Sequence, residues 1–436
     1  MMKICAAIGS ADEIEKHTLA DLAEIRLDVF KKIPNNLSVP RLITFKDTPD
    51  YTILPNGFNE MIDVGESEFP ITDATVLSSY HDMVNTPNAT KIADIMNGME
   101  GDIAKGAFTV NQFTDLANIY KASKMLDKKH VLIGMGELGM ITRVRSDILK
   151  NEFTFAHTGT PTAIGQLSIE EMRKLGDDCT ITGIVGHPLS YSLSQKLHTQ
   201  AFKDTNVNGI YLKFDVLSLD DIENVIRYFN IRGLNVTIPY KTDIIRHLDK
   251  IDKTAEAIGA VNTITNLNGC LTGTNTDVAG INAAFEHASV KLNASKKILI
   301  IGSGGSAKAC TYTFRKKDAN VFIVGRNINA VAELCRRFDC TPVTNIDPTE
   351  YDIIINCTPM GMYAEAVYPL DINEITPDQA VFDLVYNVNT PLKILAKERG
   401  CKVIDGMDML IGQGLKSFNT WTKKTPDFNN IKKAIL

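Results

Sequence analysis

The feature that most constrains this chain is an apolar segment, Lys296 to Ile301, that runs directly into the glycine turn Gly302 to Ala307. Glycine lets the backbone bend sharply and approach a phosphate closely, and a following helix points its N–H groups at that phosphate. A strand, turn and helix of this kind open a dinucleotide-binding domain of about 130 residues, although an ordinary tight turn is the alternative. Because the turn lies so late in a chain of 436 residues, the preceding sequence must form at least one further domain.

The end of the next predicted strand, Asn320 to Val324, indicates which dinucleotide is bound. NAD-binding domains place an acidic residue there, against the ribose hydroxyl, but this chain has an arginine. A guanidinium can bind a 2'-phosphate through two parallel hydrogen bonds, so the sequence predicts NADP, unless the arginine only faces solvent. The predicted cofactor-binding residues of this region are Gly302, Ser303, Gly304, Gly305, Ser306, Ala307, Arg326 and Asn327.

Composition narrows the class of protein and its partners. The length predicts roughly two to four domains, and the net charge of -6 with no basic run disfavours nucleic acid as a partner. No apolar stretch approaches the ~18 residues of a membrane span, and acidic residues begin at Asp12, too early for a signal peptide. The 8 cysteines and 8 histidines form no metal-binding spacing, so we expect no metal site, and the scattered cysteines fit a cytoplasmic protein. We expect small-molecule substrates, and a homo-oligomer is compatible with the sequence.

The first part of the chain alternates short apolar runs with amphipathic helical patterns, which is typical of a parallel (β/α)8 barrel. The helical patterns are Thr90 to Met99, Asp115 to Leu126 and Ile169 to Leu175. The barrel is small, and the Pro/Asn/Gly loop between Phe45 and Glu60 predicts that one helix is missing or vestigial. The eight predicted strands are Lys3 to Ile8, Ala23 to Leu27, Arg41 to Phe45, Glu60 to Val64, Thr75 to Ser79, Asp102 to Phe108, His130 to Gly134 and Phe153 to Ala156.

The rest of the chain predicts two further α/β units, joined to the barrel directly near Lys174 to Asp178. We expect the barrel at 1–176, a substrate-binding domain at 177–276 completed by 407–436, and a Rossmann NADP-binding domain at 277–406. The expected elements are strands Thr180 to Val185, Ile210 to Phe214 and Gly233 to Ile238, a helix Leu219 to Phe229, strands at Val321, Ile353, Ala380 and Lys402, and a last helix Gly412 to Trp421 that folds back onto the second unit.

Polar residues with complementary chemistry gather in the second unit. The segment GLNVTIPYK ends at Lys241, AIGAVNT contains Asn262, and GTNTD ends at Asp277. A lysine beside an aspartate can pass a proton to or from a hydroxyl while a nicotinamide exchanges the hydride. Taken singly, Lys241 would more often be a surface residue and Asp277 a helix cap.

Together and in this order, these segments resemble the shikimate dehydrogenase family over residues 180 to 422. The resemblance implies that Lys241 and Asp277 form the catalytic pair. It also implies that a serine pair in GHPLSYSLS binds the substrate carboxylate, and that NCTPMGM, DLVY and DGMDMLIGQG line the site. Tyr191 and Gln195 depart from the family pattern. The implied substrate residues are Ser192, Ser194, Asn235, Thr237, Asn262, Tyr386 and Gln413, and the implied further cofactor residues are Thr358, Met360, Leu384 and Gly406.

The first unit contains a candidate imine-forming lysine. Lys105 lies among apolar residues in GDIAKGAF, and burial would lower its pKa and supply the neutral amine that attacks a ketone. A lysine that reaches solvent from a strand end is an equal alternative. His81, at a strand end in SSYHD, could shuttle protons. The segment EIRLD adds Glu24 and Arg26 on one strand face, and Arg143 follows a glycine turn, as in an anion site.

These segments resemble type I 3-dehydroquinate dehydratase over most of residues 3 to 175. The resemblance implies that Lys105 forms a Schiff base and that His81 is the general acid/base. In this chain Lys46 stands where the family has arginine, the following Glu-Gly-Gly segment is absent, and no carboxylate partner of His81 can be assigned. The implied substrate residues are Glu24, Arg26, Lys46, Arg143, Thr162 and Gln166.

The two resemblances support each other, because dehydration of 3-dehydroquinate gives the ketone that a shikimate dehydrogenase reduces with NADPH. The sequence therefore predicts a bifunctional shikimate-pathway enzyme, a lyase joined to an oxidoreductase. Two alternatives stay open. One is a shikimate or quinate dehydrogenase joined to an impaired barrel, and the other is a non-catalytic sensor or repressor derived from the same pair of domains.

Overall fold

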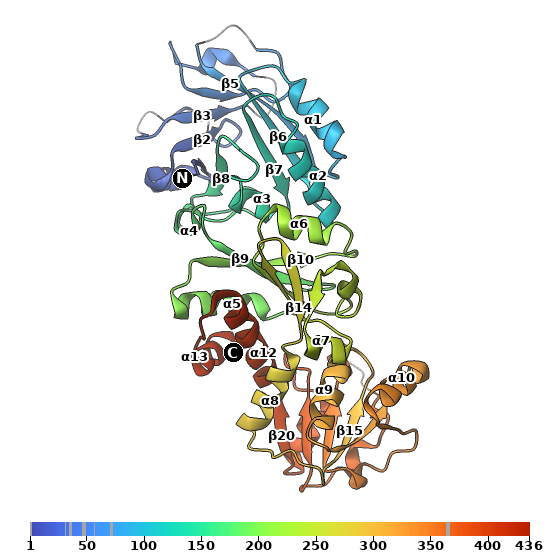
Figure 1. The fold of residues 1–436 in the computed structure, drawn as a ribbon. Coiled ribbons are helices and arrows are strands. Elements are labelled where there is room, and N and C mark those ends of the chain that lie inside the picture. The colour runs from blue at the N-terminus through green and yellow to red at the C-terminus, as the bar shows by residue number, and fades with distance from the viewer. Residues whose placement is uncertain are drawn as a thin grey trace. The chain divides into compact units, whose positions relative to one another are not determined.

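The computed structural model describes residues 2–30, 32–34, 37–45, 49–55, 57–69, 73–362 and 367–436. Two compact units are present (Figure 1). The first contains Met1–Thr182 and Asn208–Ile231, and the second contains Gly183–Val207 and Arg232–Leu436. No described helix is long and apolar enough to cross a membrane.

Within the described residues of the first unit, eight parallel strands form one sheet, in the order β7-β6-β5-β4-β3-β2-β1-β8. The edges of this sheet approach each other, because Glu152 N, just before β8, donates to His130 O of β7 at 2.9 Å. The predicted eight-stranded α/β barrel is confirmed, almost closed. Its strands are β1 (Ile4–Ala7), β2 (Leu22–Arg26), β3 (Arg41–Thr44), β4 (Met61–Asp63), β5 (Thr75–Asp82), β6 (Ile103–Thr109), β7 (His130–Met135) and β8 (Thr154–His157).

Helices cover the barrel unevenly. Figure 1 shows α1 (Ala89–Asn97) and α2 (Phe113–Ser123) beside β5 to β7, and α3 (Met140–Val144) and α4 (Ile169–Leu175) follow. The expectation that only one helix is missing or vestigial is wrong, because the described parts of the first four connections hold only the 3-10 helices η1 (Ala11–Leu19) and η2 (Tyr51–Ile53). These connections are short, and the second and third contain prolines, which lack an N–H donor and disfavour a helix: Pro34, Pro40 and Pro55.

A segment from later in the sequence packs against α2 in this first unit. It consists of β10 (Gly209–Asp215) and α6 (Ile222–Tyr228). Tyr120 stacks on Tyr228 with ring centroids 4.0 Å apart, and Phe113 lies 5.4 Å from Phe214. Aromatic pairs of this kind bury a large apolar area, so β10 and α6 contribute to the core of the first unit.

The second unit begins with a mixed sheet and the helices that cover it. Strands β9 (Thr180–Gly186), β11 (Gly233–Val236), β13 (Thr263–Leu267), β14 (Cys270–Thr274) and β12 (Lys250–Ile251) are neighbours in that order. The helices are α5 (Ser194–Thr205), η3 (Asp243–His247), α7 (Lys253–Ile258), α12 (Gly406–Thr422) and α13 (Phe428–Ile435).

The last helices differ from the prediction. Helix α12 begins at Gly406 rather than at the predicted Gly412, because the Asp405 carboxylate caps it by accepting from Met407 N at 3.0 Å. Helix α13 was not predicted. The expected return onto the second unit is confirmed by Trp421 of α12, whose Nε1 donates to Ile264 O at 2.9 Å.

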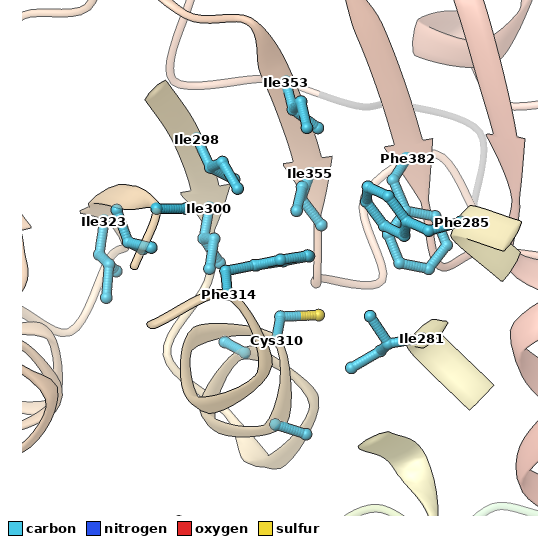
Figure 2. Packing of buried hydrophobic residues seen from close by; sticks show 14 of the residues in the cluster. Ile281, Phe285, Ile298, Ile300, Cys310, Phe314, Ile323, Ile353, Ile355 and Phe382 are labelled. Carbon is cyan, nitrogen blue, oxygen red and sulfur yellow. The ribbon is translucent and has the colours of Figure 1, made fainter. Parts of the chain in front are cut away.

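A parallel sheet with the order β17-β16-β15-β18-β19-β20 completes the described part of the second unit. This is the order of a Rossmann fold, whose ligand site lies where the order reverses, here between β15 and β18. Figure 2 shows Phe314 and Cys310 of α9 facing the apolar side chains of the sheet. The strands are β15 (Lys297–Ile301), β16 (Asn320–Val324), β17 (Thr341–Pro342), β18 (Ile353–Asn356), β19 (Ala380–Asp383) and β20 (Lys402–Asp405); the helices are α8 (Asp277–His287), α9 (Gly305–Arg315), α10 (Ile328–Phe338), η4 (Pro348–Glu350), η5 (Ile372–Glu374) and α11 (Pro391–Glu398).

Candidate active sites

A cleft in the second unit brings together residues from both of its sheets. Each of the seven substrate residues predicted for this unit lines it, as do both members of the predicted catalytic pair. The lining includes Ser192, Ser194, Asn235, Thr237, Lys241, Asn262, Asp277, Tyr386 and Gln413.

The centre of this cleft is an ion pair. Lys241 Nζ lies 2.5 Å from Asp277 Oδ2, and the two side chains are 14% and 5% exposed. Asn262 Nδ2 donates to the other carboxylate oxygen at 2.8 Å. Asp277 is the first residue of α8, and a helix N-terminus stabilises a negative charge. The carboxylate is therefore fixed from two sides, while the lysine lines the cleft.

A buried group of hydroxyls holds Asn262 in place. Asn262 Oδ1 accepts from Thr276 N at 2.7 Å and from Thr263 Oγ1 at 3.0 Å. Ser417 Oγ contacts the hydroxyls of Thr263 and Thr276 at 2.8 and 3.0 Å. Sequence reasoning missed these three hydroxyl residues. The spacing of four between Gln413 and Ser417 on one helix could have found the last of them.

Two tyrosines form another wall of the cleft. Burial raises the pKa of Tyr386 to about 12, and Tyr191 acts in the same direction. Tyr191 lines the cleft, so this departure from the family pattern lies where it can contact a ligand. Gln413 Oε1 accepts from Asn262 Nδ2 at 3.4 Å.

The glycine turn joins β15 to α9 and lies against the side chain of Lys241. Gly302 has a φ of +121°, and a Cβ added there would lie 3.0 Å from Thr358 Cγ2. A Cβ added at Gly305 would lie 3.0 Å from Lys241 Cδ, whereas one at Gly304 would meet nothing within 4 Å. The turn thus leaves open space at Gly304 beside the start of α9, a geometry that fits a dinucleotide phosphate.

The other predicted cofactor residues divide into two groups. Arg326 is exposed after β16, and Asn327 caps α10 by accepting from Ala330 N at 3.0 Å. Ala307 is buried in the core. Met360 packs among apolar residues of another cluster, and Met362 lines the cleft. The predicted residues that do line the cleft are Ser306, Thr358, Leu384 and Gly406.

Lys105 lies inside the barrel of the first unit. It belongs to β6, where it pairs in register with Ser79 of β5, and its side chain is 8% exposed. Its Nζ lies 2.9 Å from Asp63 Oδ2 and 4.9 Å from the centre of the Phe155 ring. Strand alternation points Lys105 to the same side as the apolar residues Ile103 and Ala107 of the barrel interior.

Asp63 is a buried functional candidate that sequence reasoning missed. Its side chain is 1% exposed, and it accepts from Ser79 Oγ at 2.6 Å and from Gly65 N at 3.1 Å. Burial alone would raise the pKa of Asp63, but the Lys105 ammonium and these hydrogen bonds bring it below its ordinary value. Asp63 is recognised as a candidate only from the register of β4, β5 and β6, which places it near Lys105.

The expected lowering of the Lys105 pKa is wrong. Burial acts in that direction, but the carboxylates of Asp63 and Glu24 outweigh it and raise the pKa of Lys105. Lys105 is therefore an ammonium in the resting barrel, and a role as nucleophile would require an adjacent group to remove its proton.

The remaining barrel residues surround this pair. Burial raises the pKa of Glu24, which accepts from Thr44 Oγ1 at 3.0 Å. Burial lowers the pKa of Arg143 to about 10. His81 is exposed near the end of β5. Loss of hydration by neighbouring protein atoms, and then the Lys105 ammonium, nevertheless lower its pKa to about 4.

Arg26, Thr162 and Gln166, also predicted for the barrel site, contact other residues. Arg26 donates to both carboxylate oxygens of Asp28, at 3.1 and 2.6 Å. Thr162 donates to Gln166 Oε1 from its N–H at 2.8 Å and from its hydroxyl at 3.0 Å. Lys46 lies outside the described residues.

Comparison with known proteins shows which family the part of the chain that forms the cleft resembles. Residues 184–264 match the family model described as the shikimate dehydrogenase substrate binding domain, and residues 406–436 match the shikimate 5'-dehydrogenase C-terminal domain. A shikimate dehydrogenase (NADP(+)) of Methanococcus maripaludis is 42% identical over 272 residues, which are 59% of this chain and 96% of the relative. This chain belongs to the shikimate dehydrogenase family.

Solved shikimate dehydrogenases have the same fold over this region. A crystal structure of a shikimate dehydrogenase in complex with NADP+ matches with a TM-score of 0.57 at 34% identity, and the match covers 60% of this chain and 96% of the chain in that structure. The enzyme of Thermus thermophilus, in complex with NADP(H) and shikimate, has a TM-score of 0.55 at 29% identity, with 59% and 98% covered.

The barrel matches a second family. Residues 67–177 match the family model described as type I 3-dehydroquinase. This range contains His81, Lys105 and Arg143, whereas Glu24 and Asp63 precede it. The chain therefore joins a segment that matches type I 3-dehydroquinase to a shikimate dehydrogenase, and the match begins after the first four strands of the barrel.

Proposed function

We propose that this chain catalyses two consecutive steps, the dehydration of 3-dehydroquinate to 3-dehydroshikimate and the NADPH-dependent reduction of that ketone to shikimate. The barrel performs the first step and the cleft performs the second. The observation that carries the proposal is the pair of lysine sites in one chain, each with an aspartate in direct contact.

In the cleft, bound NADPH supplies the hydride that reduces the carbonyl carbon. Lys241 donates a proton to the carbonyl oxygen as negative charge develops there. Asp277 holds the ammonium toward that oxygen, and its own position is fixed by Asn262. Ser192 and Ser194 bind the substrate carboxylate, and the glycine turn with Arg326 binds the dinucleotide phosphates.

In the barrel, the neutral amine of Lys105 attacks the substrate ketone, and loss of water leaves an imine. The imine withdraws electrons, so His81 can remove the proton from the carbon next to it. The electron pair of that C–H bond forms the new double bond and expels the hydroxyl of the following carbon, which leaves as water with a proton returned by His81. A water molecule then adds to the imine carbon, the C–N bond breaks, and the ketone product and the Lys105 amine are released. Glu24, Arg143, Thr162 and Gln166 are assigned to the substrate hydroxyls and carboxylate.

One reaction tests both halves. The purified chain is incubated with 3-dehydroquinate and NADPH, and products are separated by chromatography. Shikimate is expected only if both sites work. Accumulation of 3-dehydroshikimate would limit the function to the barrel. Unchanged 3-dehydroquinate, together with reduction of added 3-dehydroshikimate, would instead favour a dehydrogenase joined to an impaired barrel.

A further inference from the structure

We propose that Asp63 is a catalytic residue of the barrel that accepts the proton from Lys105 and returns it to the oxygen that leaves as water when the imine forms. This inference deepens the proposed dehydration and rests on it. It assigns to Asp63 a step separate from the later removal of the carbon-bound proton by His81.

The contacts of Asp63 favour this role. Its Oδ2 atom lies 2.9 Å from Lys105 Nζ, within the range for direct proton transfer. The other oxygen, Oδ1, accepts from Ser79 Oγ at 2.6 Å and from Gly65 N at 3.1 Å. The two donors fix the carboxylate through Oδ1 and leave Oδ2 for the lysine, so the acceptor oxygen is already in position.

Neighbouring groups are less suited to this step. Glu24 accepts a hydrogen bond from Thr44 Oγ1. Among the described residues, Lys105 Nζ donates its hydrogen bond to Asp63 and forms its ion pair with Asp63. The Phe155 ring lies against the ammonium and offers no group that can hold a proton. His81 stands two positions beyond Ser79 on β5, toward the open end of the strand.

The step balances as a proton shuttle. An N–H proton of the Lys105 ammonium moves to Asp63 Oδ2, and the freed electron pair forms the N–C bond to the substrate carbonyl carbon. The nitrogen, positively charged after attack, loses a second N–H proton, which passes to the carbonyl oxygen and makes it the hydroxyl of a neutral carbinolamine. Asp63 then protonates that hydroxyl, the C–O bond breaks, water leaves, and the nitrogen electron pair forms the C=N bond. Asp63 ends the sequence as a carboxylate.

The alternative is that Asp63 only holds Lys105 as an ammonium. The two roles predict opposite effects for Asp63→Asn. Loss of a proton acceptor slows imine formation, whereas loss of a charge that stabilises the ammonium makes the neutral amine more abundant and speeds it. The sign of the change therefore decides between them.

The experiment measures imine formation directly. The full-length chain is mixed with 3-dehydroquinate and borohydride, which reduces the imine to a stable adduct, and mass spectrometry follows the peptide that contains Lys105. For Asp63→Asn we expect the adduct to form about 100-fold more slowly at neutral pH. We also expect its rate to rise between about pH 6 and about pH 9, because solvent base must then take the proton.

Four measurements make the outcome interpretable. Asp102→Asn is the matched control, since it changes an aspartate next to the same strand whose carboxylate accepts only from Val76 N in the described contacts, and it should form the adduct at the wild-type rate. Dehydrogenase activity reports on the second unit, and circular dichroism on folding. Asp63→Glu keeps a carboxylate, so it should restore a rate that varies little with pH.

The results separate two failures. No adduct on wild-type Lys105 would contradict the proposed dehydration itself. A normal wild-type adduct, with an unchanged or faster rate in Asp63→Asn, would overturn only the role of Asp63. If Asp63→Asn does not fold, a steep pH dependence in Asp63→Glu would overturn it equally.

Discussion

The barrel and the cleft each contain a lysine in contact with an aspartate, but the surroundings of the two pairs differ. In the barrel, Lys105 and Asp63 are 8% and 1% exposed and lie 2.9 Å apart, with a second buried carboxylate nearby. In the cleft, Lys241 and Asp277 are 14% and 5% exposed, lie 2.5 Å apart and line an open site. The same two residue types can therefore serve as nucleophile and base in one place and as a proton donor and its anchor in another.

Removing each lysine gives the largest expected effect and separates the two sites. Lys105→Ala should abolish dehydration, because no other described group is placed to form the imine. Lys241→Ala should lower reduction of 3-dehydroshikimate by about 10²- to 10⁴-fold, the usual contribution of a positioned acid or base. Each variant should keep the other activity. The two activities are measured separately, with 3-dehydroquinate alone and with 3-dehydroshikimate and NADPH.

This separation can fail in a recognisable way. If Lys241→Ala reduces 3-dehydroshikimate at the wild-type rate, Lys241 is not the proton donor. Lys424→Ala, which changes an exposed lysine after α12, controls for general loss of positive charge and should leave both activities unchanged.

The amide beside Asp277 provides the next largest effect. Asn262→Ala removes a hydrogen bond to a charged carboxylate, and such bonds contribute about 1.5–3 kcal/mol. The kcat of reduction should therefore fall by roughly 10- to 100-fold, while dehydration stays unchanged. Steady-state kinetics checks this, with Asn320→Ala at the exposed start of β16 as the control. A rise in KM alone would show that Asn262 binds substrate and does not position Asp277.

The side chain after β16 should decide the choice of cofactor. Arg326→Ala should raise the KM for NADPH by roughly 10-fold and leave that for NADH nearly unchanged, because only NADPH carries the 2'-phosphate that a guanidinium binds. Arg336→Ala, on the exposed side of α10, is the matched control. Equal losses with both cofactors would contradict the assignment.

Much of the fold followed from local patterns. The strands of the barrel and the strand β15 before the glycine turn are apolar runs that the sequence shows directly. The order of Asn262 and Asp277 in their two motifs predicted the polar groups of the cleft. Asp63 could not be found in this way, because its role depends on the register of β4, β5 and β6, which brings together residues far apart in the sequence.

Electrostatics explains the other differences. The sequence indicated that Lys105 would be buried, and burial alone lowers a lysine pKa, but it did not reveal the two carboxylates that reverse the direction. In the same way, the sequence predicted Met360 as a cofactor residue, but Met360 packs in an apolar cluster and Met362 lines the cleft, because the direction of the chain after β18 is not specified by a local pattern.

The smallest expected effect is the response of the barrel to mild acid. His81 has a pKa of about 4, below the ordinary histidine value of about 6.5, so its imidazole stays neutral and able to accept a proton well below neutral pH. The kcat/KM of dehydration should then change less than about twofold between pH 7 and about pH 5.5. An ordinary histidine would be about 90% protonated at about pH 5.5 and would cost roughly tenfold. Initial rates across this range, followed by the absorbance of the conjugated product, distinguish the two cases. A tenfold loss would mean that the Lys105 ammonium and the surrounding protein do not hold His81 neutral, and that the charge balance around the Lys105–Asp63 pair differs from the one described above.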